Sequence, residues 1–148
     1  MTMAKPFLYI HPILTSVVAL VYAAVGLLEI GGPPEDLGEG RTIQRWFLVA
    51  IFAAGTVSLT LAARSSWLLL RAEEDQQIVD GPLRLAKMSL RWTFGMLVVG
   101  PAIALIEISF TGAWYGLILA FFSGAFMFFP CGLLLRWQLR RIRVRRFG

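Results

Sequence analysis

Four apolar stretches dominate this chain, at residues 7–30, 46–63, 92–110 and 114–135. The hydrocarbon core of a bilayer is about 30 Å thick, so a helix that rises 1.5 Å per residue crosses it with about 20 apolar residues. Backbone polar groups find no water there, so each stretch must satisfy its hydrogen bonds within a helix. The sequence therefore predicts an all-α bundle of four transmembrane helices.

The composition agrees with a membrane protein. Of 148 residues, 57% are hydrophobic and only 16% are charged, whereas about a quarter of an ordinary soluble domain is charged. Four spans and their loops leave too few residues for a separate soluble domain, so residues 1–148 are expected to form one membrane domain. The first apolar run is too long for the core of a typical signal peptide and is interpreted as a retained span.

The basic residues predict how the chain crosses the membrane. With four spans, twelve Lys and Arg residues fall on the side that holds both termini and the middle loop, and only Arg41 and Arg45 fall on the other side. Because positive charge stays on the cytoplasmic side, both termini are expected in the cytoplasm. The bacterial cytoplasmic membrane is the expected location, with the membrane of an organelle as the alternative.

Tryptophan positions support the same topology, since indole rings prefer the headgroup level of a bilayer. This topology puts two of them at the outer boundary and three at the inner boundary, and none at mid-membrane. These are Trp46 and Trp114, and Trp67, Trp92 and Trp137.

The connections between spans also have local signatures. The second helix is expected to continue past the membrane to about residue 74, after an outer loop that reaches about Arg45. Asp80 and Pro82 indicate a helix start, and the amphipathic stretch that follows leads straight into the third span. Only a few residues around Gly112 join the third and fourth spans, so these must form an antiparallel hairpin. The fourth helix is expected to continue into the basic tail at residues 136–148.

Small residues at a spacing of four predict which helix faces pack, because helices in lipid associate by close approach. The predicted packing positions are Ala50, Ala54, Ser58 and Ala62 in the second span, Gly116, Ala120 and Gly124 in the fourth, and Ala19, Ala23 and Gly26 in the first. Aromatic residues between Phe121 and Phe129 surround the fourth helix, so some must face lipid or another subunit. Pro101 and Pro130 can each kink a helix.

Basic residues near the cytoplasmic ends of the helices form a predicted collar. It comprises Arg84, Lys87, Arg91, Arg136, Arg140, Arg141, Arg143, Arg145 and Arg146. Each basic residue beside an anionic leaflet contributes about 1 kcal/mol, so the collar is expected to bind anionic lipid headgroups. The acidic surface of a partner is the alternative. Nucleic acid is not expected, because these residues flank the spans and form no soluble patch.

His11 is the single histidine of the chain and lies about one turn into the first span. An ionisable residue in a membrane is a candidate functional group. His11 could ligate a haem, with the second axial ligand from elsewhere, or bind a quinone. It could equally be a neutral side chain that hydrogen-bonds a carbonyl or a lipid headgroup.

Glu29 and Glu107 lie near the outer ends of the first and third spans. If these helices are neighbours, the two carboxylates could bind a cation or share a proton. Pairing with Arg41 or Arg45 is the structural alternative.

No catalytic motif or metal-ligand cluster is recognisable, so neither a catalytic residue nor a metal site is predicted and a self-contained enzyme is not expected. No cofactor is required by the sequence. The first hypothesis is a non-catalytic accessory or assembly subunit of a larger membrane complex, which packs against other subunits or itself. The alternative is a small oligomeric transporter or channel that uses Glu29, Glu107, Ser58, Thr60 and Pro101. The third hypothesis is a haem- or quinone-binding membrane protein that uses His11.

Overall fold

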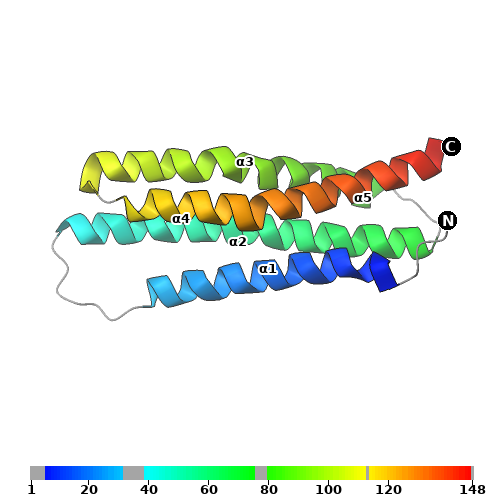
Figure 1. Cartoon of the computed structure of the whole chain (residues 1–148), viewed down its shortest axis with the longest axis horizontal. Coiled ribbons are helices and arrows are strands. Elements are labelled where there is room, and N and C mark those ends of the chain that lie inside the picture. The colour runs from blue at the N-terminus through cyan, green and yellow to red at the C-terminus, as the bar shows by residue number, and fades with distance from the viewer. Residues whose placement is uncertain (1–5, 32–38, 76–79, 113, 148) are drawn as a thin grey trace.

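Four long helical rods lie along the length of the molecule, and each runs antiparallel to the rod before it in the chain (Figure 1). The computed structural model describes residues 6–31, 39–75, 80–112 and 114–147. The elements are α1 (Pro6–Ile30), α2 (Glu39–Glu74), α3 (Asp80–Thr111), and then α4 (Tyr115–Ser123), η1 (Gly124–Phe128) and α5 (Phe129–Phe147), which form one continuous rod. In the described part of the chain, all four rods are long and apolar enough to cross a membrane. This confirms the predicted all-α bundle of four spans.

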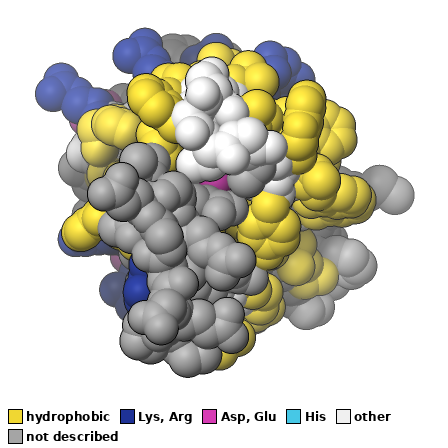
Figure 2. All heavy atoms as spheres, turned by 90° about the vertical axis from the view of Figure 1, so that its left-hand side faces the viewer, with side chains coloured by type: hydrophobic (Ala, Val, Ile, Leu, Met, Phe, Trp, Pro, Cys, Tyr) yellow, Lys and Arg dark blue, Asp and Glu magenta, His cyan; other side chains and the backbone are white. Residues whose placement is uncertain are grey.

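The two ends of the bundle differ in chemistry. The start of α1 and the end of α5 lie at the same end (Figure 1), together with the end of α2 and the start of α3. We call this the arginine-rich end, because α3 and α5 bring the predicted basic collar there. The opposite end, where α3 turns back into α4, is called the hairpin end. Figure 2 looks onto the hairpin end and shows apolar side chains along the flanks of the molecule.

Most helix boundaries follow the sequence pattern, with one difference. The amphipathic stretch from Asp80 and the third span form one helix, and the last rod continues through the basic tail to Phe147. Gly112 closes the hairpin between α3 and α4 with a φ of 67°, a left-handed conformation that glycine adopts without strain. α2, however, already begins at Glu39, so the expected outer loop up to Arg45 is shorter than predicted. Helix propensity continues through this polar segment, where hydropathy gives no signal.

α2 is the central helix of the bundle. It packs extensively on both α1 and α3, whereas α1 has little contact with α5. The middle of the bundle is filled by Tyr22, Phe52 and Phe128, and the Tyr22 ring contacts the rings of both phenylalanines. A second apolar cluster around Leu69, Ala86 and Leu135 lies toward the arginine-rich end. α1 is therefore held mainly by α2, and the surface between α1 and α5 is open.

Small side chains let several helices approach closely. Gly116, Ala120 and Gly124 are all buried, and a Cβ atom at Gly124 would lie 3.2 Å from Leu97 of α3. On α1, Ala19 and Gly26 are buried and Ala23 is half-buried, and a Cβ at Gly26 would lie 2.7 Å from the Phe52 ring. On α2 the predicted packing positions differ in burial: Ser58 and Ala62 are buried, Ala54 is half-buried and Ala50 is exposed. The row of small residues therefore turns toward the surface in the direction of the hairpin end.

The last rod contains one π-helical turn, η1, two residues before Pro130. The Phe129 N–H donates to the Gly124 carbonyl, five residues earlier. Such a turn accommodates one extra residue and is a known way to adjust a membrane helix near proline. Positions at a spacing of four drift about 40° around an α-helix at each step, because one turn takes 3.6 residues. The wider turn offsets this drift, so Phe128 faces the core like Gly124 before it.

Candidate functional site

Three consecutive residues of α2 join it to each of the other three rods near the arginine-rich end. The Ser65 hydroxyl lies 2.7 Å from the hydroxyl of Ser89 on α3. The Ser66 hydroxyl donates to Oε1 of Gln138 on α5 at 2.7 Å. The Trp67 indole N–H donates to the hydroxyl of Ser16 on α1 at 2.9 Å. Successive helical residues point about 100° apart, which is why three neighbours can reach three different helices.

About two turns further along α2, two glutamates make further contacts with α5 and α1. Glu73 forms an ion pair with Arg141 of α5, whose Nε lies 3.3 Å from the carboxylate, and Glu74 accepts a hydrogen bond from the Tyr9 hydroxyl on α1. Arg141 also lies over the Trp137 ring, 5.5 Å from its centroid. These contacts fix the position of Trp137 at the arginine-rich end.

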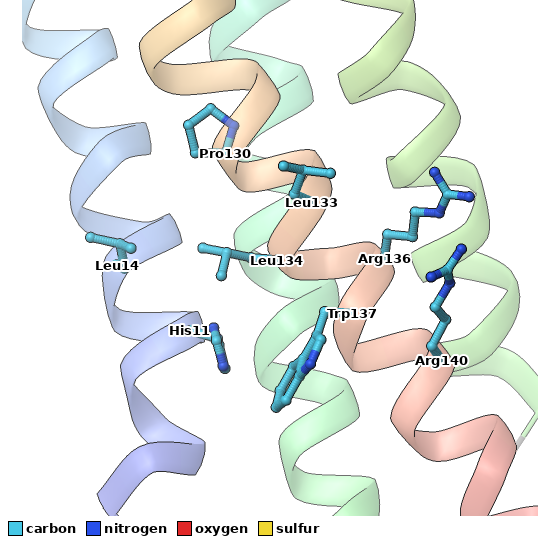
Figure 3. A pocket seen from close by; sticks show the side chains of 8 residues that line it. All are labelled: His11, Leu14, Pro130, Leu133, Leu134, Arg136, Trp137 and Arg140. Carbon is cyan, nitrogen blue, oxygen red and sulfur yellow. The ribbon is translucent and has the colours of Figure 1, made fainter.

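An open groove of about 640 Å³ lies between α1 and α5 beside Trp137 (Figure 3). The ring of His11 lies on one wall, 4.8 Å from the Trp137 ring centroid. The His11 Nδ1 atom is buried and has no hydrogen-bond partner among the described residues. The lining residues are His11, Leu14, Pro130, Leu133, Leu134, Arg136, Trp137 and Arg140. We call this the apolar groove.

A second groove of similar volume lies between α3 and α5. Five of its nine lining residues are basic, and none of the nine is acidic. They are Leu83, Lys87, Leu90, Arg91, Arg136, Leu139, Arg140, Ile142 and Arg143. We call this the basic groove. On each helix the basic residues are three or four positions apart, so they lie on one face of that helix. The two faces line opposite sides of the groove.

Arg136 and Arg140 line both grooves, so the two grooves meet along one edge of α5. The predicted collar is therefore not uniform. Five of its members line the basic groove, and Arg141 is instead held by Glu73 and Trp137. Arg84 is exposed and lines neither groove. Arg145 and Arg146 lie on α5, but their side chains fall outside the described part of the structure.

The hairpin end buries one predicted carboxylate. The Glu107 side chain of α3 is fully buried and lies against Gly116 of α4, where a Cβ atom would collide with the carboxyl group. The absence of a side chain at Gly116 thus makes room for the carboxyl group. Glu29 lies on α1, but its side chain is outside the described residues, so the predicted proximity of Glu29 and Glu107 stays a prediction.

The other residues predicted for a transport path lie in different surroundings. Ser58 is buried, and its hydroxyl has no hydrogen-bond partner among the described residues. Pro101 is half-buried, whereas Thr60 is exposed on the outside of α2. The apolar groove likewise offers His11 as its one strong axial ligand for haem, since its other lining residues contain no Met, Cys or second His. The haem and quinone options for His11 stay predictions.

Sequence reasoning missed the polar contacts that join the helices. Ser65, Ser66 and Gln138 were not singled out, although all three are buried and hydrogen-bonded. The available signal was the run of three hydrogen-bonding residues, Ser65 to Trp67, within an apolar helix. Their partners could not be found from sequence, because the order of the helices around α2 was unknown.

The fold and the apolar surface define the class of this chain: it is an integral membrane protein with four spanning helices. No protein-family model matches the chain, and no curated protein or solved structure matches it. Its function must therefore be argued from its own surfaces.

Proposed function

We propose that this chain is a non-catalytic subunit of a larger membrane complex, and that it binds a transmembrane helix of another protein. The observation that carries the proposal is a row of exposed phenylalanines along α4, η1 and the start of α5. The row, here called the phenylalanine ridge, comprises Phe121, Phe122, Phe126 and Phe129. In the isolated chain, Phe121 and Phe126 are about 70% exposed.

The ridge is ordered by its own contacts. The rings of Phe122 and Phe126 are stacked 5.9 Å apart, and Phe121 packs edge-on against Phe122. The π-turn contributes by directing Phe128 into the core while Phe126 and Phe129 face outward. Association in lipid depends on van der Waals packing between rigid surfaces, and a pre-ordered aromatic surface loses little side-chain entropy when another helix packs on it.

Charge favours a different protein over a second copy as the partner. Beyond the ridge, the same rod leads into the arginines of α5 at the arginine-rich end. Two parallel copies joined through the ridge would bring these arginines together and repel each other. A partner helix with small residues opposite the ridge and acidic residues at its membrane boundary would complement both features.

Site-specific photo-crosslinking in native membranes tests this proposal. A photoreactive amino acid at Phe126 should give a discrete product with another membrane protein, and the same group at Leu20 should not. Leu20 is equally exposed but lies on α1. The captured protein should then co-purify with wild-type chain in mild detergent and be lost from the Phe122→Ala/Phe126→Ala variant. A product of twice the chain mass, or crosslinks to lipid alone, would contradict the proposal.

The buried position of Glu107 favours a second candidate function, a small transporter or channel. Ionisable side chains inside a membrane bundle often mark ion or proton pathways, and Glu107 is enclosed between α3 and α4. Proteoliposomes that contain the protein should then show a proton or cation flux that falls in Glu107→Gln. Absence of flux in wild-type protein would reject this candidate.

A further inference from the structure

We infer that one anionic phospholipid binds at a defined site on α5, with its phosphate at Arg136 and Arg140 and an acyl chain in the apolar groove. This goes beyond a general attraction between a basic collar and an anionic leaflet, and it does not depend on the proposed partner. The chemical requirement is a phosphate group joined to an apolar chain.

The polarity of the apolar groove matches such a molecule. Pro130 and Leu133 lie toward the middle of the bundle, and His11 and Trp137 lie toward the arginine-rich end, while the side chains of Arg136 and Arg140 extend along the α3 side of α5 at the level of the leucines (Figure 3). Indole rings prefer the headgroup level, so Trp137 indicates that this end of the groove lies at the depth of lipid headgroups, within reach of the long arginine side chains. A chain that extends from that level into the membrane would contact the apolar half of the groove.

The charged part of the site has the features of a phosphate site. Arg136 and Arg140 are one helical turn apart, are exposed, and line both grooves. Across the basic groove, Lys87 and Arg91 of α3 are also one turn apart. Guanidinium groups bind phosphate oxygens through paired, charge-assisted hydrogen bonds. This facing arrangement surrounds an anion with cations from two helices.

His11 supplies an independent indication of a ligand. Its ring lies on the wall of the apolar groove against Trp137, and Nδ1 is buried without a partner among the described residues. Buried polar atoms in proteins are nearly always hydrogen-bonded. A modest rotation of the ring, whose second torsion is broad, would turn Nδ1 toward the groove, where a phosphate or glycerol oxygen would be its partner.

Lipid retention measured by native mass spectrometry tests the inference. The full chain in detergent is mixed with phosphatidylglycerol or phosphatidylcholine, and bound lipids are counted. Wild-type protein should retain one phosphatidylglycerol and release phosphatidylcholine. Arg136→Gln/Arg140→Gln should weaken this binding roughly 30-fold, because each basic residue near an anionic surface contributes about fivefold.

The matched control is Arg64→Gln/Arg71→Gln, which removes the same charge from exposed residues of α2 outside both grooves and outside the collar. It should bind phosphatidylglycerol like wild type. Equal losses in the two variants would reduce the site to general electrostatics and overturn the inference. Arg136→Lys/Arg140→Lys, which keeps the charge but not the paired hydrogen bonds, should bind more weakly than wild type and more tightly than the glutamine variant, and a melting curve of each variant verifies that it is folded.

Two further measurements test the part of the groove that holds the acyl chain. Leu133→Trp fills the groove without changing charge and should weaken binding, whereas Leu20→Trp on another exposed face should not. Soluble glycerol 3-phosphate carries the same phosphate without a chain, so it should compete poorly. If glycerol 3-phosphate displaces the lipid at equal concentration, or if Leu133→Trp has no effect, the apolar groove is not part of the site and the inference fails.

Discussion

At the scale of single residues, the contact between Glu107 and Gly116 shows how a polar group is enclosed in this bundle. The carboxyl group occupies the space that a side chain at position 116 would take. Gly116 was predicted as a packing residue from its spacing with Ala120 and Gly124, and Glu107 was predicted as an ion or proton group. The structure brings these two residues together across the hairpin, which neither pattern indicated.

The contact makes a quantitative prediction. Gly116→Ala should lower the free energy of unfolding by about 1–3 kcal/mol, the usual cost of an overpacked site. In a Glu107→Ala background the added methyl group has room, so the same substitution should cost much less. Unfolding of the four variants in mixed micelles measures this coupling.

Gly100→Ala is the control, because a Cβ there would lie 3.8 Å from Ala120, an ordinary packing distance. It should leave stability nearly unchanged. If Gly116→Ala costs the same with and without the Glu107 carboxyl group, the contact does not determine the packing of α3 on α4.

At the scale of elements, the sequence predicted the spans well and their fine geometry poorly. Bilayer thickness sets the length of an apolar helix, so hydropathy was enough to find all four spans. Glu39 was missed as the start of α2, because a polar helical turn outside the membrane has no hydropathy signal. The π-turn was also missed, because the spacing of small and apolar residues along a helix does not show where one extra residue is inserted. Pro130 indicated only that some adjustment was needed nearby.

The π-turn predicts an unusual tolerance to deletion. Removing Ala125, an exposed residue of η1, should convert the turn to regular α-helix while the residues on either side keep their faces. The variant should remain folded and monodisperse in detergent, with a small change in melting temperature. Circular dichroism and size-exclusion chromatography provide the measurements.

Deletion of Val98 provides the comparison. Val98 is an exposed residue of α3, where the described helix has no π-turn to absorb the change. All residues on one side of the deletion should rotate by about 100°, which moves Ala104 and Glu107 away from the interior. This variant should be strongly destabilised. Equal damage from both deletions would show that the π-turn does not act as a single-residue insertion.

At the scale of the whole molecule, the distribution of charge and the arrangement of helices agree. The helices bring the start of α1 and the end of α5 to one end of the bundle (Figure 1), as expected if both termini lie on the same side of a membrane. The positive-inside rule assigns that side to the cytoplasm. This orientation, and the bacterial membrane expected for the chain, are predictions.

Protease protection of tagged protein tests the orientation. Protease is added to cells whose outer layers have been made permeable while the cytoplasmic membrane stays intact. Short tags at the two termini should both resist the protease in these cells, and both should be cleaved after lysis. A tag in the loop between α1 and α2 should be cleaved in intact cells. Cleavage of only one terminal tag would contradict the even number of spans, and cleavage of both terminal tags from outside would reverse the assignment.

The three hydrogen-bonding residues in the last third of α2 also bear on how the protein is made. A ribosome delivers α1 and α2 first, so the Trp67–Ser16 contact can form early, and the Ser65–Ser89 contact can form once α3 has entered the membrane. The Ser66 hydroxyl meets Gln138 only when α5, the last segment to be synthesised, is in place. A nascent chain that stops short of α5 would expose this hydroxyl to lipid, which gives cellular quality control a chemical difference between unfinished and finished molecules.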